Sequence, residues 1–293
     1  MGPDLRYHLA TLITVLFAVI VGVIIGANLT DPKELQRRED RLNAKVDNAL
    51  KETRRVGQEA ALARQAAFEA KQAEEFAAKS LLAPVVRNKL LGRRVALVHS
   101  GGLPTRPARS AIETVLQLAG AEPASFTTFD ARLAGDGTAL EALATQLQWP
   151  VEANQRLEHF ARAAAAVFAT GDAAGLMKTL SDAKLAQLAS DYKRPVHAVV
   201  LLGGADDKQS LPATTLDRAL IKALLAAKLT VVGCESSTVP TSSMAEYARQ
   251  HISTVDNIES WSGQVSLVWT LAGQRGHYGT KSGASAKLPP LMP

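Results

Sequence analysis

The segment Val196-His-Ala-Val-Val-Leu-Leu-Gly-Gly204 is the most informative stretch for the fold. Its apolar residues run almost continuously instead of alternating with polar ones, and a glycine pair follows them at once. Such a strand is buried on both faces, which is typical of a parallel sheet covered by helices on both sides. The segment 93–100 has the same character, and Gly101 and Gly102 follow it.

Helical and strand patterns alternate around these two segments. Helices are expected over 107–119, 138–148, 154–169, 173–190, 214–228 and 260–272, and further strands over 124–129, 229–234 and 252–255. This alternation predicts an α/β fold with a Rossmann-like, mostly parallel sheet. We expect this domain to span residues 82–275 and to be followed by a flexible C-terminal tail at 276–293.

The N-terminal region contains one long apolar run. Residues 9–29 are 21 positions without a charge, and a helix of that length spans about 30 Å, the thickness of a bilayer core. We therefore expect residues 1–30 to form a signal-anchor transmembrane helix; a cleaved signal peptide is the alternative. Ala18, Gly22 and Gly26 recur every four residues, a spacing that lets two membrane helices pair closely.

Residues 31–81 are rich in Ala, Glu, Lys, Arg and Gln and predict a long helix. Small or apolar residues recur every seven positions at Leu35, Leu42, Ala49, Val56, Ala63, Ala70 and Ala77, and Val46, Ala60 and Ala67 add a second seam position. This pattern predicts a coiled-coil stalk, and hence a homodimer or higher oligomer through the stalk and the membrane helix. A solitary helix held by charge pairs is the alternative.

Composition excludes several classes of protein. The net charge of +5 (33 − 28) comes with only 5% aromatic residues, so we expect no nucleic-acid partner. A single cysteine excludes an intramolecular disulfide and a Cys-only metal site. Only one run is long enough to cross a bilayer, which excludes a polytopic helical transporter. The sequence contains no nucleophile elbow and no HExxH motif, so we do not expect an enzyme.

Several loops follow predicted strands and would meet at one edge of the sheet. They carry the possible cleft residues Gly101, Gly102, Gly203, Gly204, Asp206 and Asp207, and the segment 235–243 joins them. Ligands of open α/β sheets bind at this edge, and Asp130 ends a strand where Rossmann proteins often keep a ribose carboxylate. Neither glycine fingerprint for phosphates is present, so turns and helix caps are the alternative.

Soft-metal ligands are sparse. His99 and Cys234 both fall at predicted strand ends and could approach each other, and His277 is a third possible copper contact. A small buried thiol and a surface imidazole are the alternative.

The segments 4–12 and 17–26 resemble the start of the mycobacterial copper-transport protein B (MctB-like) family. Segments 252–258, 263–272 and 276–280 resemble that family's C-terminal signature. The resemblance implies a single-pass envelope protein of the cell membrane that acts in copper homeostasis and export, with copper as a possible ligand but with no established ligand set. Related members look like partners in cell-wall assembly and division, so a non-catalytic envelope scaffold with a protein partner is the alternative.

The membrane orientation is open to two interpretations. The resemblance implies that the soluble domain lies outside the cytoplasm. The charge count favours the opposite side, because Arg6 alone precedes the apolar run and five basic residues follow it within the next turns, Lys33, Arg37, Arg38, Arg41 and Lys45.

Overall fold

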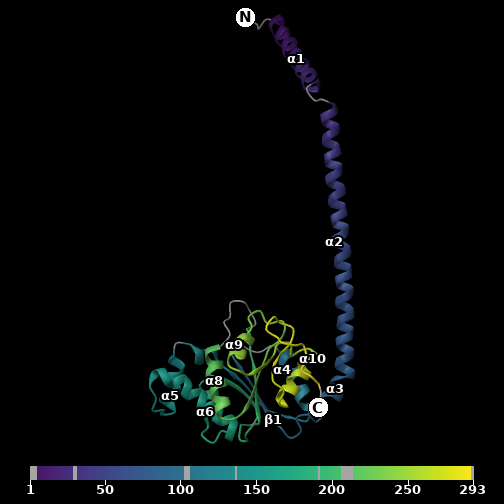
Figure 1. Cartoon of the computed structure of the whole chain (residues 1–293). Helices are drawn as coiled ribbons and strands as arrows, with labels where there is room; N and C mark the ends of the chain where they lie inside the picture. Colours follow the sequence, from purple (N-terminus) through teal and green to yellow (C-terminus); the bar gives the residue numbers. More distant parts are fainter. Residues whose placement is uncertain are drawn as a thin grey trace. The chain divides into compact units, whose positions relative to one another are not determined.

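The computed structural model describes residues 5–28, 32–101, 106–135, 137–190, 192–205 and 214–291. The chain divides into two units, residues 1–71 and 72–293. The first holds α1 (Leu5–Asn28) and most of α2 (Pro32–Ser80), whose strong helix formers are uninterrupted by proline (Figure 1). Over the residues described, none of the helices combines the length and the apolar character needed to cross a bilayer.

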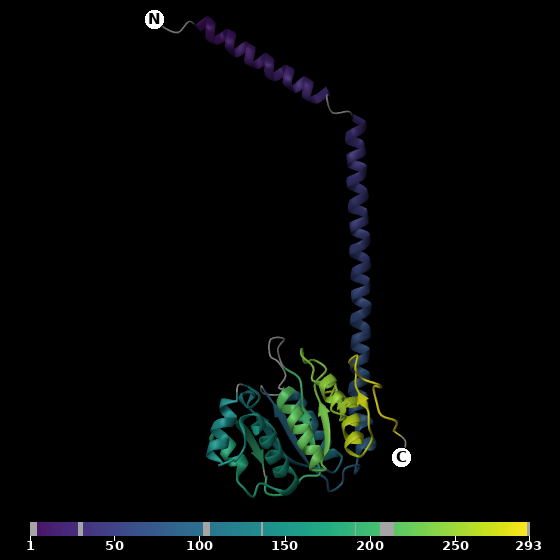
Figure 2. The ribbon, with the colours of Figure 1, turned by 60° about the vertical axis from the view of Figure 1, so that its left-hand side comes forward.

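The second unit is built on a seven-stranded sheet (Figure 2). The strands are β1 (Arg94–Ser100), β2 (Glu122–Phe129), β3 (Ala186–Ser190), β4 (Ala198–Leu202), β5 (Thr230–Cys234), β6 (Ser253–Val255) and β7 (His277–Tyr278). Their order is β3-β2-β1-β4-β5-β6-β7, and all neighbours are parallel except β2 and β3. The order reverses between β1 and β4, as in doubly wound folds. The predicted α/β class and mostly parallel sheet are therefore confirmed.

Helices cover both faces of this sheet. One face carries α3 (Leu82–Val86), α4 (Arg106–Leu118) and α10 (Trp261–Leu271), and the other carries α5 (Thr138–Gln146), α6 (Arg156–Thr170), α7 (Leu176–Asp182), α8 (Thr214–Ala226) and α9 (Met244–Arg249). Short 3-10 turns lie at Ala131–Ala134 and Ala153–Gln155. Alternate strand residues enter separate cores, Leu97 with Ile112 on one side and Val98 with Phe160 on the other. Continuous apolar strands are required because both faces are covered.

The helix expected over 173–190 is wrong in its second half. α7 ends at Asp182, Lys184 adopts a left-handed backbone with φ of 56°, and residues 186–190 form β3. β3 pairs antiparallel with β2, so the hydrogen bonds of a sheet edge override the helical propensity of an Ala- and Leu-rich segment.

The C-terminal segment also differs from the expected flexible tail. Thr254 pairs with His277 and Val255 with Tyr278, so β7 adds a last strand to the sheet. Asp256 then accepts hydrogen bonds from the backbone nitrogens of Thr280, at 2.7 Å, and Lys281, at 3.1 Å. Local sequence gives little sign of this order, because the partners lie more than twenty residues away.

The end of α2 belongs to the second unit. Ala77 is buried there, and Oε1 of Glu74 accepts a hydrogen bond from the backbone nitrogen of Trp261 at 2.7 Å. Trp261 opens α10, so Glu74 satisfies a free amide at the start of that helix, where a negative charge is favourable. Ala77, an expected seam residue, and Glu74 therefore contact the folded body instead of a second stalk.

Candidate functional site

The structure separates the three residues expected to contact copper. His99 on β1, Leu202 on β4 and Cys234 on β5 lie in one register row. Two strand spacings therefore separate His99 from Cys234, roughly 10 Å between backbones. His277 pairs with Thr254, one residue before the Val255 that pairs with Cys234, so its side chain faces the opposite side of the sheet.

The surroundings of these side chains are also distinct. Nδ1 of His99 hydrogen-bonds the carbonyl of Leu202 at 2.8 Å, and Nδ1 of His277 hydrogen-bonds Oγ1 of Thr254 at 3.0 Å. Cys234 lies in an apolar core, and this burial raises the pKa of its thiol well above the usual value. Within the described residues, no three His, Cys, Asp or Glu side chains are grouped so that they could hold a metal ion.

Side chains pack closely against Gly203 and Gly204, two of the expected cleft residues. A Cβ at Gly203 would lie 2.8 Å from both Ser243 Cβ and the ring of Tyr247, and one at Gly204 would meet Val239. Glycine is therefore required for packing at this strand end. Gly101 ends β1 beside an open cavity described below, whereas Gly102, Asp206 and Asp207 lie outside the described residues.

A buried carboxyl group lies beside the point where the strand order reverses. Asp217 in the first turn of α8 is 3% exposed, and the hydroxyl of Tyr247 donates a hydrogen bond to its Oδ2 at 2.7 Å. Burial raises the pKa of Asp217 to about 6, and the Tyr247 bond opposes part of that rise. No sequence motif singles out Asp217, although its position three residues before Leu220 places it on the apolar face of the helix.

A second buried carboxylate follows β5. The side chain of Glu235 is 0% exposed, and it accepts hydrogen bonds from Lys281 Nζ at 2.5 Å, Ser242 Oγ at 2.5 Å and the nitrogen of Ser243 at 3.0 Å. Lys281 Nζ also donates to the carbonyl of Ser236 at 3.1 Å. The segment 235–243 therefore closes around its own carboxylate instead of lining an open cleft.

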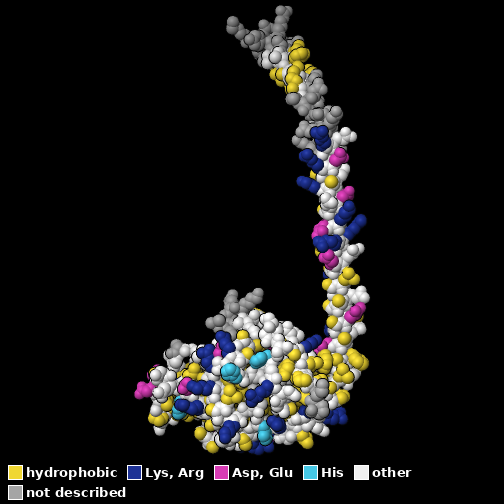
Figure 3. Space-filling model, in the orientation of Figure 1, with side chains coloured by type: hydrophobic (Ala, Val, Ile, Leu, Met, Phe, Trp, Pro, Cys, Tyr) yellow, Lys and Arg dark blue, Asp and Glu magenta, His cyan; other side chains and the backbone are white. Residues whose placement is uncertain are grey.

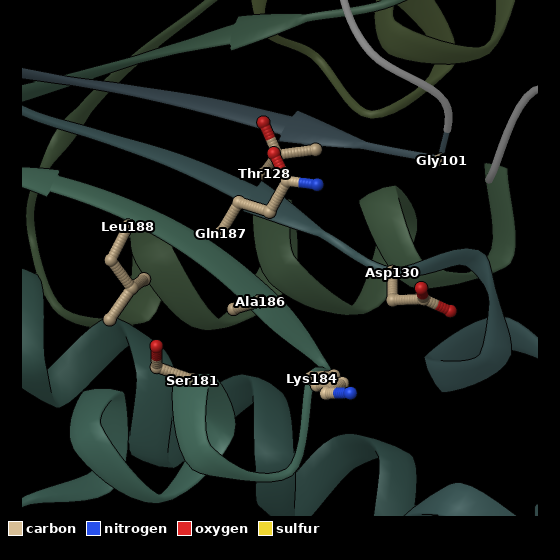
Figure 4. Close-up of a pocket in the computed structure, with 8 residues that line it drawn as sticks. All are labelled: Gly101, Thr128, Asp130, Ser181, Lys184, Ala186, Gln187 and Leu188. Atoms are coloured by element: carbon tan, nitrogen blue, oxygen red, sulfur yellow. The ribbon is translucent and has the colours of Figure 1, made fainter.

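The open space lies farther along the same edge, at the ends of β1 and β2 and the start of β3. A cavity of about 640 Å³ opens there (Figure 4), within the size range of small-molecule sites. Its lining is mostly polar and consists of Gly101, Thr128, Asp130, Ser181, Lys184, Ala186, Gln187 and Leu188.

Arg132 fixes the charged end of this cavity. Oδ1 of Asp130 accepts bonds from the backbone nitrogen of Arg132 at 2.9 Å and from its Nε at 2.8 Å, while Nη2 donates to the carbonyl of Lys184 at 2.6 Å. The hydrogen bond from Arg132 lowers the pKa of Asp130, so this carboxylate is ionised at neutral pH.

The stalk helix carries exposed apolar side chains. At the expected seam, Leu42, Val46 and Val56 are 61%, 54% and 52% exposed, and Figure 3 shows hydrophobic side chains among charged ones along α2. In α1, Ala18 and Gly22 are exposed, and a Cβ at Gly22 would meet no other atom; the surroundings of Gly26 lie outside the described part. Both helices thus offer small or apolar faces on which another helix could pack.

Comparison with known proteins identifies the family. No curated protein matches the chain. The model of a family described as copper transport outer membrane protein, MctB, matches residues 3–289, which include the apolar run, the long helix and nearly all of the sheet unit. Because that match covers almost the whole sequence, the chain belongs to the MctB family of copper transport outer membrane proteins.

Proposed function

We propose that this protein acts in copper export as a membrane-anchored envelope protein. The observation that carries the proposal is the family match over residues 3–289, since membership implies a copper transport role. The uncharged run at 9–29 supports an N-terminal anchor of bilayer length. The family description supports a body held on the envelope side, outside the cytoplasm.

One membrane helix limits how this role is performed. An ion path through a bilayer needs polar groups shielded from lipid, and the run 9–29 offers only Thr11, Thr14 and Asn28 as hydrogen-bonding side chains. We therefore infer that export requires several copies or a partner protein, and that the folded body acts outside the bilayer.

Deletion of the gene should raise total cellular copper when copper is added to the medium. Reintroducing the wild-type gene should return copper to its wild-type level. Elemental mass spectrometry of washed cells measures both. A Cys234→Ala copy should restore copper to the same level, because the buried thiol lies in an apolar core apart from the two histidines. Unchanged copper in the deletion strain would contradict the export role, and failure of the Cys234→Ala copy at wild-type protein levels would contradict the exclusion of Cys234 from copper handling.

We further propose that α2 pairs with a second copy through the seam between Leu42 and Ala70. Three large seam residues are more than half exposed in the single chain, and burying them would gain roughly 1.5–3 kcal/mol each. Residues 74 and 77 contact the folded body, which supports a seam that ends before Gln72. Pairing of the Ala18, Gly22 and Gly26 face would add to the same dimer. This stalk equally suits an envelope scaffold that binds a cell-wall or division protein.

Cysteine cross-linking of the full chain in membranes tests the seam directly. Val56→Cys should give a disulfide-linked dimer on mild oxidation. Leu62→Cys should not, because Leu62 lies off the seam although it is more exposed (67% against 52%). The native thiol does not interfere because it is buried. Equal cross-linking at both positions, or none at Val56→Cys, would contradict the seam.

A further inference from the structure

The cavity beside β1, β2 and β3 has no place in the copper proposal, and its position is that of a ligand site. Open α/β sheets bind ligands outside the carboxyl ends of their strands, next to the reversal of strand order. Here the reversal lies between β1 and β4, and the cavity opens at the carboxyl ends of β1 and β2. The rim is held by backbone bonds, from Gly101 N to Phe129 O at 3.0 Å and from Asp130 N to Leu185 O at 2.9 Å.

Hydrogen-bonding groups in the lining remain available. Thr128 is 5% exposed and its Oγ1 has no partner within the described residues, which is costly for a buried hydroxyl. Its register partner on β3 is Gln187, whose amide is exposed. Arg132 occupies Oδ1 of Asp130, and Oδ2 accepts no bond from any residue that the structure describes. The cavity thus offers a carboxylate acceptor, an amide and a hydroxyl.

The charges at the cavity favour an anion. Asp130 is balanced by Arg132, and Lys184 leaves one positive charge in excess. Figure 4 shows the Lys184 ammonium and the Asp130 carboxylate at the same end of the lining, with Thr128 and Gln187 farther along the strands. Lys184 lies just after α7, and its left-handed backbone, with φ of 56°, ends that helix and leads the chain into β3 at the cavity.

We propose that this cavity binds a phosphorylated sugar, either free or as the ribose phosphate of a mononucleotide. Lys184 binds the phosphate, and Oδ2 of Asp130 accepts hydrogen bonds from sugar hydroxyls. The side-chain amide of Gln187 donates a hydrogen bond to a sugar hydroxyl. The volume of about 640 Å³ accommodates a ligand of this size. The absence of a glycine fingerprint in the sequence argues against a dinucleotide.

Isothermal titration calorimetry of the purified full chain tests this binding with four probes: AMP, ribose 5-phosphate, adenosine and inorganic phosphate. Adenosine and inorganic phosphate each supply only part of the contacts. We therefore expect the affinity for each of them to be at least about tenfold lower than for the phosphorylated sugar that binds more tightly. Equal affinity for AMP and ribose 5-phosphate would identify the free sugar phosphate as sufficient, and tighter binding of AMP would identify a mononucleotide. Absence of binding by both phosphorylated sugars would overturn the proposal.

Substitutions locate the site. Lys184→Gln and Asp130→Asn should each lower the affinity for the tighter-binding phosphorylated sugar by about tenfold. Lys178→Gln should leave that affinity unchanged, because Lys178 lies outside the lining and pairs with Asp182. Tryptophan fluorescence checks that each variant is folded. If Asp130→Asn unfolds, Gln187→Leu takes its place, because Gln187 is exposed and tolerates substitution more readily. Unchanged affinity in the folded variants would overturn the assignment. The copper measurements are unaffected by either outcome.

Discussion

Replacing Lys281 with methionine should lower the free energy of unfolding of the body by about 3–5 kcal/mol, the cost of leaving a buried charge without its partner. Glu235 is fully enclosed, and the Lys281 ammonium is its only cationic partner within the described residues. The two serine contacts remain in the variant, but they do not neutralise the charge. Chemical unfolding of the full chain, followed by fluorescence of Trp149, Trp261 and Trp269, measures the loss.

Two further variants separate charge from packing. Lys281→Met combined with Glu235→Gln should recover most of the loss, because it removes both members of the buried pair. Lys287→Met is the matched control, since this exposed lysine lies in the same segment and should change stability by less than about 0.5 kcal/mol. If Lys281→Met is as mild as Lys287→Met, the tail is not fastened through Glu235.

Asp217 should make the stability of the body fall as the pH rises from about 4 to above 6. The folded pKa of about 6 exceeds the ordinary value of 3.8, so the folded state binds the proton more tightly in that window. Folding is therefore more favourable below the unfolded pKa, and this contribution is lost as the pH rises through the folded pKa. The shift corresponds to about 3 kcal/mol at full burial.

Asp217→Asn tests this dependence, because its amide oxygen still accepts the Tyr247 hydrogen bond without gaining a charge. The difference in unfolding free energy between wild type and Asp217→Asn should change by about 2.5 kcal/mol between pH 4 and pH 7.5, with the variant gaining relative stability at the higher pH. Asp182→Asn, an exposed acid on α7, should show no comparable change. A constant difference for Asp217→Asn across the range would contradict the raised pKa.

The C-terminal segments that resemble the copper-transport family have a structural role in this chain. Gly279 lies so close to Asp256 that a Cβ there would overlap the carboxylate, and Gly263 lies equally close to the backbone of Asn257. Asp256 in turn binds the backbone of residues 280 and 281. These segments therefore pack against one another at the end of β6 and maintain the fold of the sheet edge.

Strands of continuous apolar residues were predictable because their pattern is local. The runs within β1, β4 and β5 can be buried only between two helical layers, and the glycine pairs that follow β1 and β4 indicate turns. The segment 186–190 was not predictable in the same way. Its composition favours a helix, and only the free edge of β2 makes it a strand.

The candidate site shows the same division. Asp130 was identifiable from its place after a strand, but Lys184 and Gln187 were assigned to a helix and reach the cavity only because β3 folds back on β2. His99 and Cys234 were correctly placed at strand ends. Their separation by β4, however, depends on strand order, which strand sequences do not encode individually.

The α/β class, the long helix and the family follow from local sequence, because apolar periodicity, helix propensity and short motifs are properties of neighbouring residues. The hydrogen bond between Glu235 and Lys281 spans 46 positions, and the bond from Glu74 to the start of α10 spans 187, so both depend on how the folded chain packs. The cavity beside Gly101 likewise gains residues 186–188 because β3 folds back on β2. These outcomes depend on which strands become neighbours and which charges are buried together, and those long-range pairings are fixed by packing of the whole sheet.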